Sequence, residues 1–218
     1  GAALPRHPLR REIIATHVAN SMVNRVGPTF AHRLFEETGA AAPDIVRAYL
    51  GTRQIFDLVS LWQANDAPDH PADLATRHEI VMASVRLVER GTVWLLHERG
   101  ALRNLDATIN RFAAGVAQVG QGLDHWVVPQ ERAALEAETA RLVERGVPES
   151  LALRVARLDA QGSGLDIVEV AAESGIDIGT VAGVYFGVGG RRELGWLSQQ
   201  IDALPADSHW QALARLAM

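Results

Sequence analysis

The sequence of 218 residues contains no cysteine and no lysine. Without cysteine it can form no disulfide, no thiol nucleophile and no thiolate metal site. Without lysine it has no Schiff-base nucleophile, no amine base and no phosphate-loop lysine, because all 21 basic residues are arginine. These absences exclude several kinds of catalysis from this stretch of chain.

Long apolar runs are missing as well. None approaches the roughly 20 residues that a membrane-spanning helix needs, and no secretory signal is recognisable. The formal net charge of −5 disfavours general nucleic-acid binding, because phosphate neutralisation requires a basic face. It also provides no polybasic attraction to an anionic membrane. We therefore expect neither nucleic acid nor a membrane as a partner.

Strand patterns are also missing, since no stretch alternates strictly between apolar and polar residues between hairpin turns. Helical periodicity, in contrast, is present in almost every window. Ile14, Val18, Met22 and Val26, for example, recur every four residues, as on one face of a helix. The sequence predicts an all-α fold, an irregular multi-helix bundle of about ten helices without a substantial sheet.

Proline and glycine mark the predicted helix ends. Gly27 and Gly39 each follow an apolar periodic run and are expected to end a helix, whereas Pro43 is expected to begin one. The loop at 65–71, with two prolines, is the best boundary along the chain. The sequence therefore predicts an N-terminal helical segment, 1–65, and a main helical bundle, 66–218.

The longest periodic run covers about 71–99, and Gly91 inside it predicts a bend or a close contact with another helix. Its apolar seam is predicted to consist of Val81, Val85, Val88, Thr92 and Leu95. A further run begins at Asp106, and three glycines make its second half uncertain. The last third predicts short helices at 167–174, 180–188, 193–204 and 208–218.

The eight histidines do not form a metal-binding motif. They are at positions 7, 17, 32, 70, 78, 97, 125 and 209. A helical zinc-protease signature needs two histidines four residues apart with a glutamate between them. Neither His78-Glu79 nor His97-Glu98 is followed by the second histidine, so we assign no metal ligand.

Other catalytic and cofactor patterns are equally incomplete. The glycine-rich pieces at 120–122 and 187–190 do not follow a predicted strand, as a dinucleotide-binding loop must, and the second is interpreted as a helix stop. Ser163 lacks the spacing of a nucleophile elbow. Acidic pairs such as Glu36-Glu37 and Glu136/Glu138 are interpreted as solvated helix faces. We assign no catalytic residue and no cofactor-binding residue.

The segment 166–181 resembles a helix-turn-helix, with Ala171, Gly175 and Val181 at the matching positions. A recognition helix must show hydrogen-bonding groups to bases and cations to phosphates. The second helix, 180–186, has neither, and we expect it to be mostly buried. A stand-alone DNA-binding regulator of this type is the alternative function.

Five tryptophans, at 62, 94, 126, 196 and 210, lie among apolar residues at helical spacing. Most are predicted to be core residues, although some could anchor an interface. A large exposed apolar patch is also expected if this module has been separated from a longer chain.

Five segments, in order, carry a family resemblance. Residues 7–30 read HPLRREIIATHVANSMVNRVGPTF and 43–58 include VRAYL and IFDL. Residues 87–96 include LVER and WLL, 165–186 include LDIVEVAA and VYF, and 196–215 include WL and LPADSHWQALAR. Together they resemble the C-terminal part of the large bacterial-type NAD-specific glutamate dehydrogenases.

The resemblance implies a long cytoplasmic parent enzyme that converts L-glutamate, water and NAD to 2-oxoglutarate, ammonia and NADH. Its catalytic and NAD-binding domains would precede this stretch, which would be a helical accessory module, structural or regulatory. The implied cofactor is NAD for the parent, with none bound by this stretch. The implied partners are the rest of the same polypeptide and identical subunits of a homo-oligomer. No family catalytic residue matches a position here, and the isolated stretch is expected to be inactive.

Overall fold

The computed structural model describes residues 7–98 and 100–191. Within these residues the chain forms eleven helices and no strand, so the predicted all-α class is confirmed. The helices are α1 Arg10–Val26, α2 Phe30–Thr38, α3 Ala42–Ile55, α4 Leu58–Asn65, α5 Leu74–His97, α6 Leu105–Trp126, α7 Pro129–Glu144, α8 Glu149–Ala156, α9 Leu158–Gln161, α10 Gly164–Ser174 and α11 Ile178–Arg191.

Several helix ends follow the expected chemistry. Gly27 ends α1 with φ of 88°, and Gly39 ends α2 in the left-handed conformation with φ of 68°, which glycine adopts without a steric cost. The amide of Gly39 donates to the carbonyl of Phe35. Asp73 caps α5 by accepting a hydrogen bond from the Thr76 amide at 2.7 Å. The glycines therefore predicted the ends of α1 and α2 correctly, whereas the cap at Asp73 was not singled out from the sequence.

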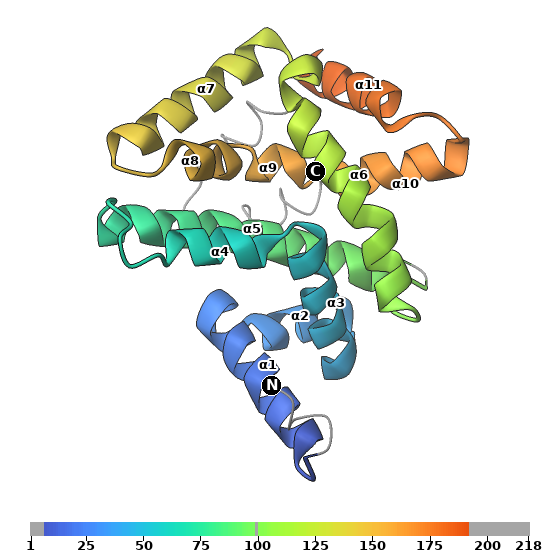
Figure 1. The fold of residues 1–218 in the computed structure, drawn as a ribbon. Coiled ribbons are helices and arrows are strands. Elements are labelled where there is room, and N and C mark those ends of the chain that lie inside the picture. The colour runs from blue at the N-terminus through green and yellow to red at the C-terminus, as the bar shows by residue number, and fades with distance from the viewer. Residues whose placement is uncertain (1–6, 99, 192–218) are drawn as a thin grey trace.

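The helices are arranged in layers around α5 and α6 (Figure 1). α3 packs along both α5 and α6, and α6 also contacts α9, α10 and α11. α1 forms one end of the molecule, and α7 lies at the opposite end. One large core joins residues of α1 to α10, and a smaller cluster joins α6, α10 and α11. Residues on both sides of the 65–71 loop belong to the same core. The division into 1–65 and 66–218 stays a prediction.

The long helix α5 has a different buried stripe from the predicted one. Val88, Thr92 and Leu95 are buried as expected, but Val81 and Val85 are only half-buried. In the first half of α5 the buried positions are instead Thr76, Ile80 and Ser84. Positions spaced alternately by four and three residues rotate slowly around a helix with 3.6 residues per turn. The buried face of α5 therefore moves to different positions in its first half.

Two glycines allow helices to approach closely. A β-carbon at Gly91 of α5 would lie 2.7 Å from Thr52 Cγ2 of α3, and one at Gly115 of α6 would lie 2.5 Å from Val168 Cγ2 of α10. Side chains at these positions would push the helix pairs apart. The close contact predicted at Gly91 is confirmed. The uncertain second half of the run after Asp106 is a continuous helix, α6.

Candidate functional site

The histidines are spread over the molecule. In the part of the chain that the structure describes, no three metal-ligand side chains of His, Asp or Glu come together. His70 is nearly buried, and its Nδ1 accepts a hydrogen bond from the Ala72 amide at 3.2 Å. Burial and the nearby Arg77 guanidinium both lower the pKa of His70. Through this hydrogen bond, His70 stabilises the loop before α5. His209 lies outside the described residues.

The glycine-rich pieces do not form a nucleotide site. Residues 120–122 are in the interior of α6, where a β-carbon at Gly120 would meet the Gln161 side chain at 3.0 Å. The helix stop predicted at 187–190 is wrong, because α11 continues through it to Arg191. Neither piece joins a strand to the start of a helix, the arrangement that binds a dinucleotide pyrophosphate. Neither piece therefore has the geometry of a dinucleotide-binding loop.

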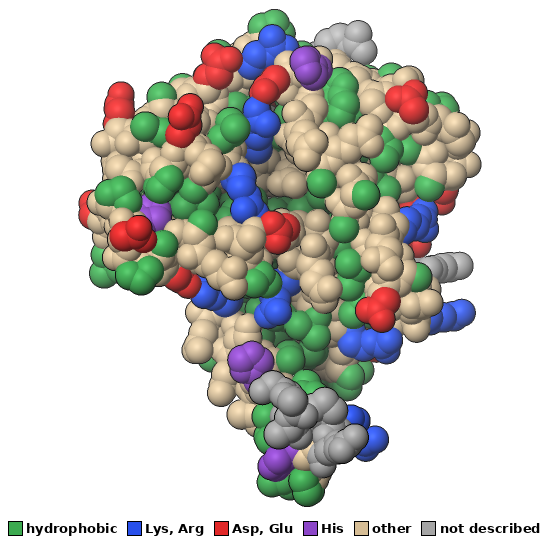
Figure 2. All heavy atoms as spheres, in the orientation of Figure 1, with side chains coloured by type: hydrophobic (Ala, Val, Ile, Leu, Met, Phe, Trp, Pro, Cys, Tyr) green, Lys and Arg blue, Asp and Glu red, His purple; other side chains and the backbone are tan. Residues whose placement is uncertain are grey.

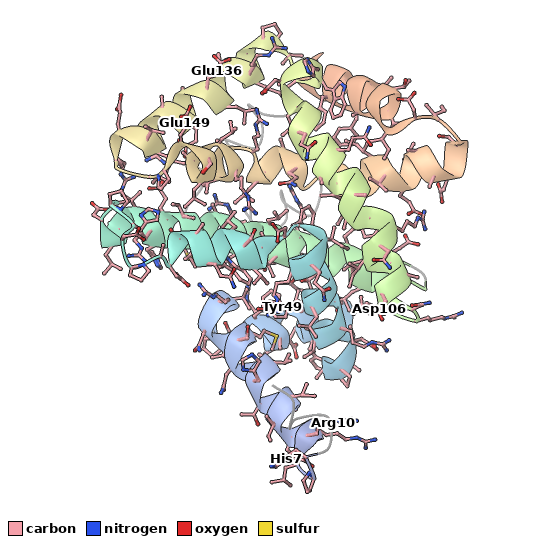
Figure 3. All side chains as sticks on the ribbon, viewed as in Figure 1. His7, Arg10, Tyr49, Asp106, Glu136 and Glu149 are labelled. Atoms are coloured by element: carbon pink, nitrogen blue, oxygen red, sulfur yellow. The ribbon has the colours of Figure 1, made fainter. Side chains whose placement is uncertain are left out.

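The remaining catalytic candidates lie at a helix end and on helix surfaces. Ser163 lies at the turn before α10, where its carbonyl accepts a hydrogen bond from the Ile167 amide at 3.1 Å. Glu36 and Glu37 are exposed on α2, and Glu136 points away from the body of the molecule on α7 (Figure 3). These acids form solvated helix faces, as the sequence indicated.

The helix-turn-helix candidate corresponds to α10 and α11, which meet at Gly175 with φ of 69°. The expectation that the second helix is mostly buried is wrong. Phe186 is buried, but Val184 and Tyr185 are 62% and 42% exposed. No lysine or arginine occurs at 158–190, so the described side chains of α11 include no cation. Phosphate binding requires cations that this face lacks, and Thr180 and Tyr185 are its exposed hydroxyl groups.

We expect that the 218-residue chain does not bind duplex DNA through this motif. Electrophoretic mobility and fluorescence anisotropy at 50 mM and 200 mM salt should show no salt-sensitive binding, because the motif has no cation to displace phosphate counterions. Tight binding that is lost on replacing Thr180 with alanine would contradict this expectation.

The described tryptophans help to join helices. Trp62 of α4 is buried, and its indole donates to Ser84 Oγ of α5 at 2.9 Å. Half-buried Trp94 of α5 donates to Asp166 of α10 at 2.7 Å. Half-buried Trp126 is the last residue of α6 and packs against the smaller core cluster. The core assignment is thus confirmed for Trp62, whereas Trp196 and Trp210 lie outside the described residues.

A cleft of about 320 Å³ lies between α5, α7, α8 and α9. Glu79 at its rim bonds to Arg141 and, at 2.5 Å, to Arg145, and Arg141 also bonds to Glu138 at 2.7 Å. Partial burial raises the pKa of Glu79, but hydrogen bonds from both arginines outweigh it and hold the pKa below the ordinary value. Glu79 thus joins α5 to α7 and its C-terminal end, whereas Glu138 pairs with Arg141 within α7. These contacts indicate a structural role for the rim.

This carboxylate gives a testable pH dependence. Because the pKa of Glu79 is lower in the folded than in the unfolded chain, its contribution is present above the ordinary value of 4.5 and is lost as pH falls through the lower, folded value. We expect Glu79→Gln to cost less than about 1 kcal/mol at pH 7, since the pair is half-exposed. Urea denaturation at pH 7 and pH 3 measures this. A difference between the two proteins that is as large at pH 3 as at pH 7 would contradict it.

The second hollow was not foreseen from the sequence. An open groove of about 910 Å³ runs between α1 and α3, and we call it the α1–α3 groove. Figure 2 shows hydrophobic and arginine side chains together at this end of the molecule. The 3.6-residue periodicity of 10–26 indicated an apolar face, but it could not indicate that none of the described helices covers this face. The groove lining consists of Arg10, Arg11, Ile14, Ala15, Val18, Ala19, Ala42, Pro43, Val46, Arg47 and Leu50.

The described residues form an all-helical module with an apolar groove that none of the described helices covers. A family model described as "Glutamate dehydrogenase, C-terminal" matches residues 1–218. The chain belongs to this family, as the sequence resemblance predicted.

Three curated relatives are called NAD-specific glutamate dehydrogenase. The proteins of Halomonas elongata, Pseudomonas aeruginosa and Mycobacterium tuberculosis are each 35% identical to this chain, over 209, 217 and 212 residues. The matches cover 96%, 100% and 97% of this chain. They cover only 13% of the length of each relative.

Proposed function

We propose that this chain is the C-terminal accessory module of a longer, NAD-dependent glutamate dehydrogenase. The parent would oxidatively deaminate L-glutamate to 2-oxoglutarate and ammonia and reduce NAD. The full-length family match supports this, as do relatives named as NAD-specific glutamate dehydrogenases. Glutamate and NAD would bind elsewhere in the parent. The described residues contain no strand–glycine loop–helix unit for a dinucleotide, and the sequence contains no lysine for the substrate pocket.

The module itself contributes packing and assembly. The observation that carries this is the poor coverage of α1, in which Ile13 and Ile14 are 41% and 45% exposed and only Met22 and Val26 are buried. Exposed apolar surface of this kind marks a contact with another protein surface. The partner would be the rest of the same polypeptide or identical subunits. In Figure 3, Arg10 marks the start of this helix and His7 lies just before it.

Truncation of the parent tests the assignment. Removing residues 1–218 should lower oligomer assembly or the melting temperature before it alters hydride transfer, measured by sedimentation velocity, thermal melts and steady-state kinetics. An unchanged oligomer of unchanged stability that has lost glutamate turnover would instead place part of the active site in this module.

The purified 218-residue chain provides the complementary test. Incubated with glutamate and NAD, it should produce no NADH, because it has no lysine and its described residues offer no dinucleotide loop. NADH formation that scales with the concentration of this chain would contradict the proposal.

A further inference from the structure

The α1–α3 groove has two walls with matched apolar rows. Ile14 and Val18 stand four residues apart on α1, and Val46 and Leu50 stand four residues apart on α3. Residues at this spacing share one face of a helix. Each wall therefore presents an i, i+4 ridge, the surface into which the ridges of another helix pack.

Small residues keep the groove open between these rows. Ala15 and Ala19 line the α1 wall, and Ala42 lines the start of α3. Their short side chains let a third helix approach both walls at once. An amphipathic helix laid into an apolar groove is a recurring mode of recognition, with anchors at i, i+3 or i+4 and i+7.

The rim of the groove is basic. Arg11 on α1 and Arg47 on α3 are exposed and line the groove from opposite sides, and no described Asp or Glu is among the lining residues. The neighbouring acids Glu12 and Asp44 do not line it. Because the chain as a whole is acidic, with a net charge of −5, this local excess of arginine selects a partner with carboxylates beside its apolar face.

We propose that the α1–α3 groove is the docking site for an amphipathic helix with acidic flanks, supplied by the part of the parent polypeptide outside residues 1–218. This inference rests on the proposed function, because it needs a longer parent. The matched relatives extend far beyond this chain, which covers 13% of their length. A tethered helix would meet the groove at high effective concentration.

Two other occupants fit less well. A second copy that paired groove to groove about a two-fold axis would bring Arg11 and Arg47 against the same arginines. A lipid surface would favour a convex helix with one continuous apolar face, whereas this surface is a trough between two helices.

Photo-crosslinking in the full-length parent tests the occupant. A benzoylphenylalanine would replace Ala15 or Ala19, which are exposed in the groove, and Ala107 on α6 would serve as the exposed control. Mixing isotopically light and heavy parent separates contacts within one chain from contacts between chains. We expect both groove positions to crosslink to one segment outside 1–218, with apolar residues every three or four positions and acidic neighbours.

Three results would overturn the inference. They are crosslinks from the groove into residues 1–218 of another copy, adducts with phosphatidylglycerol vesicles in preference to protein, and groove yields no higher than that of the Ala107 control.

Charge reversal tests the acidic flank. Arg11→Glu combined with Arg47→Glu should lower the equilibrium constant for groove occupancy about tenfold, since each reversed rim pair shifts it by about threefold, and the groove crosslink yield should fall. The matched control is Arg103→Glu, another exposed arginine, which lies outside the groove and should leave the yield unchanged. Circular dichroism verifies folding of each variant. An unchanged yield in the folded double variant would overturn the acidic partner.

The inference and the proposed function can fail separately. If truncation of the parent weakens assembly while the groove crosslinks nothing outside 1–218, the proposed function stands and the groove inference falls. If the groove crosslinks as expected but truncation changes neither assembly nor stability, the docking site stands and the assembly role falls.

Discussion

Phe112→Ala is expected to lower the free energy of unfolding of the chain by about 3–5 kcal/mol. Phe112 of α6 is only 2% exposed, and its ring meets that of Trp94 on α5 edge to face, with centroids 5.2 Å apart. Removing the ring loses this contact and leaves a cavity where α5 and α6 pack, which neighbouring side chains fill only partly. Urea denaturation followed by far-ultraviolet circular dichroism measures the change.

The matched control is Phe35→Ala on α2. Phe35 is 51% exposed, so the same substitution should change stability by no more than about 0.5 kcal/mol in the isolated chain. Similar losses at Phe112 and Phe35 would mean that the core between α5 and α6 does not have the packing described above.

The second large effect concerns two glycines. Replacing them with alanine should change the free energy of unfolding in opposite directions. Gly115→Ala should destabilise the chain by about 1–3 kcal/mol, because the new methyl group would lie 2.5 Å from Val168 Cγ2 and 3.1 Å from Ile178 Cδ1. Gly187→Ala should stabilise it by about 0.5–1 kcal/mol. A β-carbon there meets nothing within 4 Å, and alanine favours the helix.

A double mutant isolates the steric cause. Val168→Ala removes the methyl group nearest to a β-carbon at position 115, although Ile178 Cδ1 at 3.1 Å stays. Gly115→Ala should therefore cost less in that background than in the original sequence. Thermal melts of the four proteins give the coupling. Equal costs in both backgrounds would show that the contact between α6 and α10 does not limit residue size at position 115.

The sequence predicted the helix ends best where backbone geometry depends on one residue. Gly27 and Gly39 adopt positive φ, so the glycine itself specifies the stop. Gly187 has the same residue type but stands inside α11. A glycine allows a helix to end, but whether it does depends on the packing around it. Phe186, one residue earlier, is buried in the smaller core cluster, and this packing holds the helix past the glycine.

The periodicity of apolar residues identified the apolar face of each helix but not which other helix covers it. Ile14, Val18, Met22 and Val26 form one stripe on α1, yet only Met22 and Val26 are buried. In α11, likewise, Val184 and Tyr185 are exposed although they were expected in the core. Coverage depends on the tertiary path of other helices, which local periodicity does not contain. The α1–α3 groove could not be predicted for this reason.

The projecting half of α1 has a consequence for backbone dynamics. Its first three turns rest mainly on their own helical hydrogen bonds, and an isolated helix of fewer than about 12 residues is marginal in water. Amide protons there should therefore exchange with solvent through local opening long before those of α5, which is buried along its length. Any partner that covers the groove would also order this helix, so slowed exchange at 10–18 would report occupancy of the groove without a label.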